Sequence, residues 1–317
     1  MNAVQTDAVL QVDSLRKEFD DLVAVADISF AVPEGEIFGF LGPNGAGKTT
    51  SISMICGLLA PTAGEILVGG RSVLSDPREV KAMMGVVPQE VAIYEELSAR
   101  ENLVFWGGIF GLKGAELATR VDRLLVQVGL DDRAKEPTKN FSGGMKRRLN
   151  LAMGLINDPR LILLDEPTVG IDPQARRKIL DVVKDLTDEG RTVIYTTHYL
   201  EEAEELCDRV AIIDHGKILA MGTVPDLQTQ LGEGSLLTVQ GAFAGSELTA
   251  TVDAIEGLMP IEIADDRAML LVARDGPGVS ACLENLFSRG MTFDDISIKE
   301  PNLEDLFLKL TGRELRN

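Results

Sequence analysis

The chain has 317 residues, 45% of them hydrophobic, so it can bury a sizeable core, and two domains are the default expectation. A formal net charge of −19 argues against nucleic acid and anionic lipid as direct partners. No window approaches the roughly 20 apolar residues of a membrane span, and Met1 to Leu10 does not resemble a signal peptide, so we expect a cytoplasmic protein without direct membrane insertion.

An apolar run at residues 37–41 predicts a buried strand, and residues 50–59 predict a helix shortly after it. Between them lies a complete G-x-x-x-x-G-K-[ST] loop. Its backbone N–H groups and the positive end of the helix dipole face an anion, Lys48 can reach the β/γ oxygens, and the Thr49 hydroxyl can ligate Mg²⁺. The residues expected to bind nucleotide phosphates are Gly42, Pro43, Asn44, Gly45, Ala46, Gly47, Lys48, Thr49 and Thr50.

A second polar feature follows a short apolar strand at residues 85–88, which ends before Gln89. Further along, a turn made of Ser142, Gly143 and Gly144 leads into an amphipathic helix. A serine and two glycines at a helix start offer a hydroxyl and N–H donors to an anion. This turn is therefore a second candidate for phosphate contact.

Two adjacent carboxylates, Asp165 and Glu166, end the apolar strand predicted at residues 161–164. Asp165 can hold Mg²⁺ through its water shell, while Glu166 can orient or deprotonate an attacking water. Another buried strand at residues 192–197 ends at His198. His198 is thus a candidate for the same site, and a hydrogen-bonded core histidine is the alternative.

The remaining elements up to residue 225 alternate between helix and strand, which is typical of an α/β domain with a largely parallel sheet. One helical face collects Leu117, Val121, Leu124, Leu125 and Val128, and a second collects Ile179, Val182, Val183 and Leu186. Residues 210–213 and 217–220 predict a strand pair joined by a tight turn, in which we expect His215 to be solvated.

Residues 226–317 differ in charge, with sixteen acidic and seven basic side chains and a net charge of −9. They predict a small α+β domain, joined by a linker at residues 231–235. Its expected strands lie at 236–239, 269–272 and 292–298, and its expected helices at 279–288 and 303–310.

Cysteines and basic clusters add little to the functional interpretation. Cys56, Cys207 and Cys282 are widely spaced without a C-x-x-C pair, which argues against disulfides and zinc and predicts buried apolar side chains. The basic clusters at residues 146–148 and 176–178 predict solvated helix faces.

The order of phosphate loop, Gln89, Ser-Gly-Gly turn, Asp-Glu strand end, Asp172 and His198 resembles the nucleotide-binding domain of ABC transporters. The resemblance covers about residues 10–225. It implies a P-loop NTPase fold of the α/β class in residues 1–225, with a helical subdomain at about 90–160. Residues 226–317 then form the small α+β accessory domain.

The resemblance also implies roles at matching positions, with ATP and Mg²⁺ as cofactors. Phe19 takes the place of the aromatic that stacks on adenine, although a core aromatic is the alternative. Gln89 matches the glutamine that senses Mg²⁺ and the γ-phosphate, and His198 matches the histidine that contacts that phosphate. The Ser-Gly-Gly turn would bind the γ-phosphate held by a second subunit, and Asp172 would lie at the interface. An ATP-hydrolysing homodimer that closes head to tail is therefore expected.

Two departures from the family pattern are Phe141 and Met145, which stand where leucine and glutamine are usual. Met145 lacks a hydrogen-bonding group near the opposite nucleotide's sugar, which leaves nucleotide selectivity open. Met145 with the adjoining basic cluster, and the C-terminal segment at residues 300–312, resemble the ABC-2 type exporters of drugs, lipids or polysaccharides. The implied function is the ATPase subunit of an exporter, bound to the inner face of the cell membrane through an integral membrane permease.

The permease is expected to dock on residues 89–112, where four aromatic side chains gather, although a buried helical core would also explain them. These are Tyr94, Phe105, Trp106 and Phe110. One alternative function is a soluble ABC-type ATPase that acts on ribosomes or chromosomes. Another is an ATPase whose C-terminal domain binds a glycan cargo or a regulatory ligand.

Overall fold

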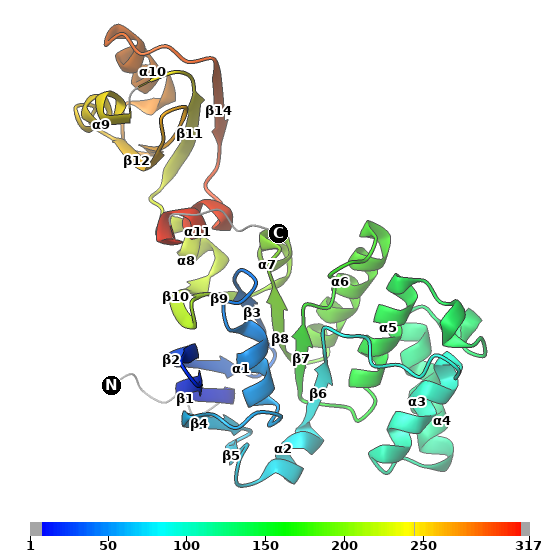
Figure 1. Ribbon diagram of the computed structural model, residues 1–317. Helices are drawn as coiled ribbons and strands as arrows, with labels where there is room; N and C mark the ends of the chain where they lie inside the picture. The colour runs from blue at the N-terminus through cyan, green and yellow to red at the C-terminus, as the bar shows by residue number, and fades with distance from the viewer. Residues whose placement is uncertain (1–7, 244, 312–317) are drawn as a thin grey trace. The chain divides into compact units, whose positions relative to one another are not determined.

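The computed structural model describes residues 8–243 and 245–311. Their contacts divide the chain between Met221 and Gly222 into two compact units, which are described separately below (Figure 1). The first unit contains the phosphate loop and all the other motifs named above up to His198.

A six-stranded sheet positions these motifs, with the strand order β10-β9-β3-β8-β7-β6. The pairs β3·β8, β3·β9, β7·β8 and β6·β7 are parallel, so the carboxyl ends of these strands meet at one edge. The strands are β3 (Ile37–Leu41), β6 (Met84–Val87), β7 (Leu161–Asp165), β8 (Thr192–Thr197), β9 (Arg209–Asp214) and β10 (Lys217–Thr223). The predictions of buried strands at 37–41, 161–164 and 192–197 are confirmed.

A second, four-stranded antiparallel sheet has the order β2-β1-β4-β5 and shares one hydrophobic core with the first. Leu10 and Leu15 from this sheet and Phe38 and Leu163 from the parallel sheet are all fully buried in that core. The strands are β1 (Ala8–Phe19), β2 (Leu22–Pro33), β4 (Ala63–Val68) and β5 (Arg71–Ser72).

Helices α3, α4 and α5 pack on one another in a cluster that the chain forms between β6 and β7 (Figure 1). The predicted apolar faces of α4 and α6 are buried at Val121, Leu124, Ile179 and Val183. None of the helices formed by the described residues is long and apolar enough to span a bilayer. The helices of this unit are α1 (Lys48–Ile55), α2 (Pro77–Met83), α3 (Ala99–Ile109), α4 (Gly114–Gln127), α5 (Gly143–Gly154), α6 (Pro173–Asp188) and α7 (Leu200–Leu206).

The helix after the phosphate loop is shifted from the predicted range of 50–59. Helix α1 starts at Lys48 because Gly47, with φ 104°, turns the chain into the helix directly from the loop. It ends at Ile55 because Gly57 has φ 66°, a left-handed conformation that favours glycine and ends helices. The two threonines after Lys48 therefore lie within the first helical turn.

The second unit is built on an antiparallel sheet of order β12-β13-β11-β14, with α9 and α10 against one face. Leu237 and Val239 of the sheet pack there with Leu248, Val252 and Leu286 of the two helices. The elements are α8 (Val224–Thr229), β11 (Gly234–Gln240), α9 (Gly245–Asp253), β12 (Leu258–Ile263), β13 (Arg267–Ala273), α10 (Gly278–Ser288), β14 (Asp295–Lys299) and α11 (Leu303–Thr311).

Several predictions for this unit need correction. The expected linker at 231–235 is not one, because Leu231 is buried and Gly234 and Ser235 already pair with β13. Strand β14 starts at Asp295 rather than residue 292, since its pairing with β11 ends where Gln240 faces Asp295. Helix α9 and strand β12 were not predicted at all. The predicted burial of the three cysteines is confirmed.

Candidate active site

A pocket of about 550 Å³ opens beside the phosphate loop. Among the residues proposed from the sequence, Phe19, Pro43, Asn44, Gly45, Gly47, Lys48, Thr49, Thr50, Gln89 and Glu166 line it. Gly42 and Ala46 belong to the same loop but face away from the pocket, into the protein. A Cβ atom at Gly42 would lie 2.2 Å from the carbonyl oxygen of Ile213, so only glycine fits there.

Lys48 is held in place by the loop that precedes it. Its side chain is only 4% exposed, and its ammonium donates hydrogen bonds to the carbonyl oxygens of Gly42 (2.7 Å) and Pro43 (3.2 Å). The same ammonium forms an ion pair of 2.9 Å with Glu166. The loop therefore directs a positive charge into the pocket.

Glu166 gathers three other candidate residues around its carboxylate. Besides the Lys48 ion pair, its Oε2 accepts a hydrogen bond of 3.1 Å from the amide of Gln89 and lies 3.4 Å from Nδ1 of His198. Glu166 also has φ 46°, a left-handed conformation that is strained for a residue other than glycine and that occurs often at active sites. Three segments far apart in the sequence thus converge on one buried carboxylate, that of Glu166.

Asp165 lies directly before Glu166 and is also buried. It accepts a hydrogen bond of 2.7 Å from Thr196, and the same threonine oxygen accepts the N–H of Glu166 at 2.9 Å. Strand β8 therefore fixes the carboxylate of Asp165 and the backbone of Glu166. The described residues contain no cluster of three or more His, Cys, Asp or Glu side chains able to cage a metal.

The Ser-Gly-Gly turn and Asp172 form a separate group that does not line this pocket. Ser142 caps α5 by accepting the N–H of Met145 (3.2 Å), and Asp172 caps α6 by accepting the N–H of Ala175 (2.9 Å). The two helix starts touch, because a Cβ atom at Gly144 would lie 2.4 Å from the Cβ of Ala175. One chain alone therefore does not bring this turn to its own phosphate loop.

Five pocket residues were missed from the sequence: Leu22, Val23, Ala24, His215 and Gly216. Leu22, Val23 and Ala24 lie at the start of β2, and His215 and Gly216 lie in the turn between β9 and β10, which belong to the other sheet. Gly216 donates a hydrogen bond of 2.9 Å to the carbonyl oxygen of Ala46, and a Cβ atom there would lie 2.7 Å from the carbonyl oxygen of Ala24. His215 is 81% exposed, as expected of a solvated turn residue, yet it borders the pocket.

Arg147 corrects the prediction that residues 146–148 form a solvated face. Its side chain is buried, and its guanidinium donates hydrogen bonds to the carbonyl oxygens of Gln89 and Val169. Burial lowers the pKa of Arg147, and the charge of Glu166 opposes that shift. Arg147 thus connects α5 to the loops that carry Gln89 and follow Glu166.

An apolar groove of about 450 Å³ lies next to β6 and Pro88. Trp106 and Phe110 line it together with Leu58, Pro88 and Met153. Of the four aromatic side chains considered from the sequence, Tyr94, Phe105 and Phe110 are each more than 40% exposed, and Trp106 is partly buried. These side chains are therefore not a buried helical core.

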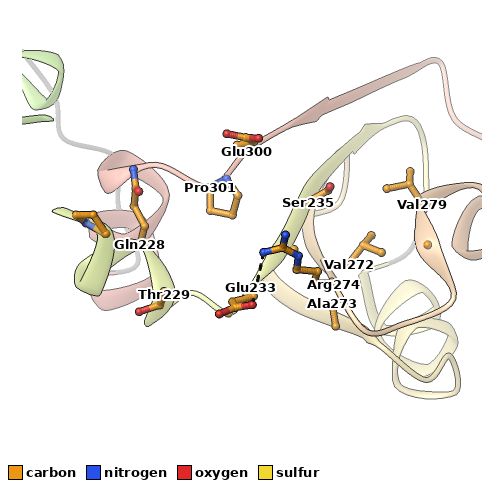
Figure 2. Close-up of a pocket in the computed structure, with 14 residues that line it drawn as sticks. Gln228, Thr229, Glu233, Ser235, Val272, Ala273, Arg274, Val279, Glu300 and Pro301 are labelled. Atoms are coloured by element: carbon orange, nitrogen blue, oxygen red, sulfur yellow. Dashed lines mark ion pairs between the residues drawn. The ribbon is translucent and has the colours of Figure 1, made fainter. Parts of the chain in front are cut away.

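The second unit has a pocket of about 550 Å³ between α8 and the ends of β11 and β13 (Figure 2). Arg274 and Glu233 form an ion pair of 3.8 Å on its wall, and Glu300 also lines it. None of the described residues that line it is aromatic, so it offers no flat face for stacking on a sugar ring.

Comparisons with known proteins agree with this site. Residues 25–169 match the family model described as ABC transporter. The chain is 42% identical to the linearmycin resistance ATP-binding protein LnrL of Bacillus subtilis, over 98% of this chain and all of that one. It is 38% identical to the Nod factor export ATP-binding protein I of Sinorhizobium fredii, over 99% of this chain and 89% of that one.

A solved structure of the ATP-binding subunit of an ABC transporter superposes on the chain with a TM-score of 0.65 and 31% identity. The superposition covers 70% of this chain and 93% of the other. The expected α/β nucleotide-binding fold of the ABC type is thus confirmed, and with it the resemblance drawn from the motifs. The chain belongs to the family of ATP-binding subunits of ABC transporters, which are ATPases.

Proposed function

We propose that this chain hydrolyses ATP in the pocket beside the phosphate loop and uses that reaction to power an exporter. The observation that carries the proposal is the convergence of Lys48, Gln89 and His198 on the buried carboxylate of Glu166. An ammonium, an amide and an imidazole are suitable partners for the oxygens of a terminal phosphate. A carboxylate among them is suitable for activating water.

The proposed reaction starts with an exchange of partners at Lys48. When the phosphates of ATP occupy the loop, they take the ammonium of Lys48 in place of Glu166, whose carboxylate then faces the attacking water. The water oxygen bonds to the γ-phosphorus while the bond from that phosphorus to the bridging oxygen breaks. The water proton passes to Glu166, and ADP and phosphate result.

The oxygen-only donor set beside the phosphate loop fits Mg²⁺, which binds hard oxygen ligands and shares them with substrate phosphates. We assign the Thr49 hydroxyl, the Asp165 carboxylate and the Gln89 amide oxygen as the groups that would hold it. Mg²⁺ would neutralise charge on the phosphates. Thr196, which bonds Asp165, would keep that carboxylate oriented.

A second copy of the chain would complete each site. The group formed by Ser142, Gly143, Gly144 and Asp172 does not line the pocket of its own chain, yet it presents a helix N-terminus suited to an anion. We propose that two chains meet head to tail, each placing this turn on the γ-phosphate held by the other. Phe19, which is 44% exposed, would stack on the adenine.

The partner of this dimer would be an integral membrane permease, which would hold the protein at the inner face of the cell membrane. Export is supported by relatives named for linearmycin resistance and Nod factor export, and those names do not favour a ribosomal or chromosomal ATPase. The exposed aromatic side chains and the groove around Phe110 support docking on residues 89–112. The groove adjoins Pro88, so docking there could act on Gln89.

Affinity purification of the Glu166→Gln variant from native membranes with ATP tests this function. The variant should hold ATP in a closed dimer and bring down a stoichiometric integral membrane protein, identified by mass spectrometry. Ribosomal or chromosomal proteins without a membrane partner would contradict the proposal and favour the soluble ATPase.

A pair of surface variants tests the docking region in the same experiment. Phe110→Glu should lose the membrane partner, because Phe110 lines the groove. Phe287→Glu is the matched control, since Phe287 is equally exposed but lies in the second unit. Equal recovery of the membrane protein with both variants would place the docking surface elsewhere.

A further inference from the structure

A buried carboxylate outside the motifs connects the segments that carry the proposed site. Glu202, on α7, is 2% exposed. Its Oε2 accepts hydrogen bonds from the hydroxyls of Tyr195 (2.9 Å), Thr197 (2.9 Å) and Thr168 (3.0 Å). Its Oε1 forms an ion pair of 2.8 Å with Nε of Arg176. A buried charge with this many partners is held in one geometry, because losing any partner is costly.

Each partner belongs to a segment that also holds a residue of the proposed site. Thr168 lies two residues after Glu166, and Thr197 directly precedes His198. Arg176 lies in the first turn of α6, where its N–H donates to the carbonyl oxygen of Asp172 (3.0 Å). Glu202 therefore joins three segments through one side chain: the loop after Glu166, the end of β8 before His198, and the start of α6.

A second contact joins Arg176 to the neighbourhood of His198. The guanidinium of Arg176 lies 4.3 Å from the ring centroid of Tyr199, and that ring lies 4.2 Å from the ring of His198. The N–H of Tyr199 also donates to Thr197 Oγ1 at 2.9 Å, so the chain around His198 is held through Glu202 on both sides. Burial raises the pKa of Tyr195 well above its usual range, and the charge of Glu202 adds to this, so that hydroxyl stays a donor.

We infer that Glu202 is a positioning residue, which ties the dimer-facing Asp172 loop to His198 and to the loop after Glu166. This inference rests on the proposed function, and it adds that a displacement of α6 at the dimer interface reaches His198 through Arg176 and Glu202. Glu202 itself touches neither substrate nor reacting atoms. Its loss therefore misplaces His198 and Glu166 but leaves the phosphate loop, whose backbone supplies most of the phosphate contacts, in place.

Glu202→Gln separates the two halves of the network. The amide oxygen can still accept the hydroxyl hydrogen bonds, but the neutral amide removes the charge that pairs with Arg176. Arg176→Met breaks the same ion pair from the α6 side. The Arg176 side chain is 30% exposed, so this variant is the alternative if Glu202→Gln folds poorly. Glu205→Gln is the matched control, because Glu205 pairs with Arg177 across the same two helices on the exposed surface.

The test measures steady-state ATP hydrolysis, ATP binding by calorimetry and the melting temperature of the purified full chain and each variant. A misplacement of about 1 Å can cost about a hundredfold in rate, so we expect Glu202→Gln and Arg176→Met to lower kcat about tenfold to a hundredfold. The Kd for ATP should stay within about twofold, because the phosphate loop and Phe19, which supply most of the proposed ATP contacts, are not displaced. The double variant should be no slower than the slower single one, because both changes break one link.

Two results would overturn the inference while leaving the proposed function intact. One is a kcat of Glu202→Gln equal to that of wild type and Glu205→Gln. The other is a loss of ATP binding that follows a fall in melting temperature, which would show a packing role only. Absence of ATP hydrolysis by the wild-type chain would instead contradict the proposed function itself.

Discussion

Gly143 and Gly144 stand side by side at the start of α5, yet alanine should have opposite effects at the two positions. A Cβ atom at Gly144 would lie 2.4 Å from the Cβ of Ala175 on α6, whereas a Cβ atom at Gly143 would meet no atom within 4 Å. Neither glycine has a positive φ, so both backbones accept alanine without strain. The two variants therefore differ only in what surrounds the added methyl group.

The expected stability changes follow from packing and helix propensity. Carbon atoms normally approach to about 3.5–4.0 Å, so Gly144→Ala must push α5 and α6 apart by about 1 Å. Such overpacking costs about 1–3 kcal/mol, of which the better helix propensity of alanine returns about 0.5–1 kcal/mol. Gly143→Ala causes no overpacking, so it should only raise the free energy of unfolding, by the same amount of about 0.5–1 kcal/mol, through better helix propensity. For a domain of this size we expect a melting temperature lower by up to about 10 °C for Gly144→Ala and higher by about 1–4 °C for Gly143→Ala.

Thermal unfolding of the full chain without nucleotide measures both shifts, and a dimerisation assay adds the functional comparison. In the Glu166→Gln background with ATP, Gly143→Ala should lose dimer despite its higher melting temperature, because its methyl group would meet the phosphate held by the partner. A Gly144→Ala variant as stable as wild type would refute the packing argument. A Gly143→Ala variant that dimerises normally would refute the proposed interface.

Three further changes probe the pocket and a helix start. Lys48→Ala should abolish ATP binding in calorimetry and lower the free energy of unfolding by about 3 kcal/mol, since the carboxylate of Glu166 stays buried without its cation. Phe19→Ala should weaken the Kd for ATP about tenfold, because stacking of a base on an aromatic ring is worth about 1–3 kcal/mol. Hydrogen bonds from the Ser98 side chain and backbone lower the pKa of Glu101, so Ser98→Ala should raise that pKa in an NMR titration. Because the folded-state pKa is lowered, this contribution to stability is present above the usual carboxyl pKa and is lost as the pH falls through the lowered value.

Each of these predictions has its own control or contradicting result. Phe110 is an equally exposed aromatic outside the pocket, so Phe110→Ala should leave the Kd for ATP unchanged. If Phe110→Ala and Phe19→Ala weakened ATP binding equally, the result would argue against stacking on Phe19. If Lys48→Ala still bound ATP, the phosphates would have to bind somewhere other than the loop that carries Lys48. A stability difference between Ser98→Ala and wild type that is independent of pH would remove Glu101 from the explanation.

The nucleotide pocket was largely predictable because its main signals are local in sequence. An apolar run, a glycine-rich loop and a helix specify the proposed phosphate site, since backbone groups would do most of the binding. The helix bounds were missed because Gly47 and Gly57 act through their positive φ values, which a hydrophobic pattern does not record.

The residues that could not be predicted from the sequence contact partners far away along the chain. Arg147 bonds Gln89 across 58 positions, and Glu202 bonds Thr168 across 34, so both charges appear as surface residues until the sheet is assembled. Strand β12 escaped prediction because it contains Pro260, which is tolerated only because β12 is an edge strand. Helix α9 escaped because glycine, serine and threonine, which favour helices weakly, make up much of it.

The most direct test of the account is the mass of the Glu166→Gln chain in solution with ATP and Mg²⁺, measured by light scattering after size exclusion. We predict twice the mass of the single chain, with two ATP molecules bound, and the single mass when Gly143→Ala is added. A chain that binds ATP and nevertheless keeps the mass of a single copy would contradict the claim that two copies complete each other's sites.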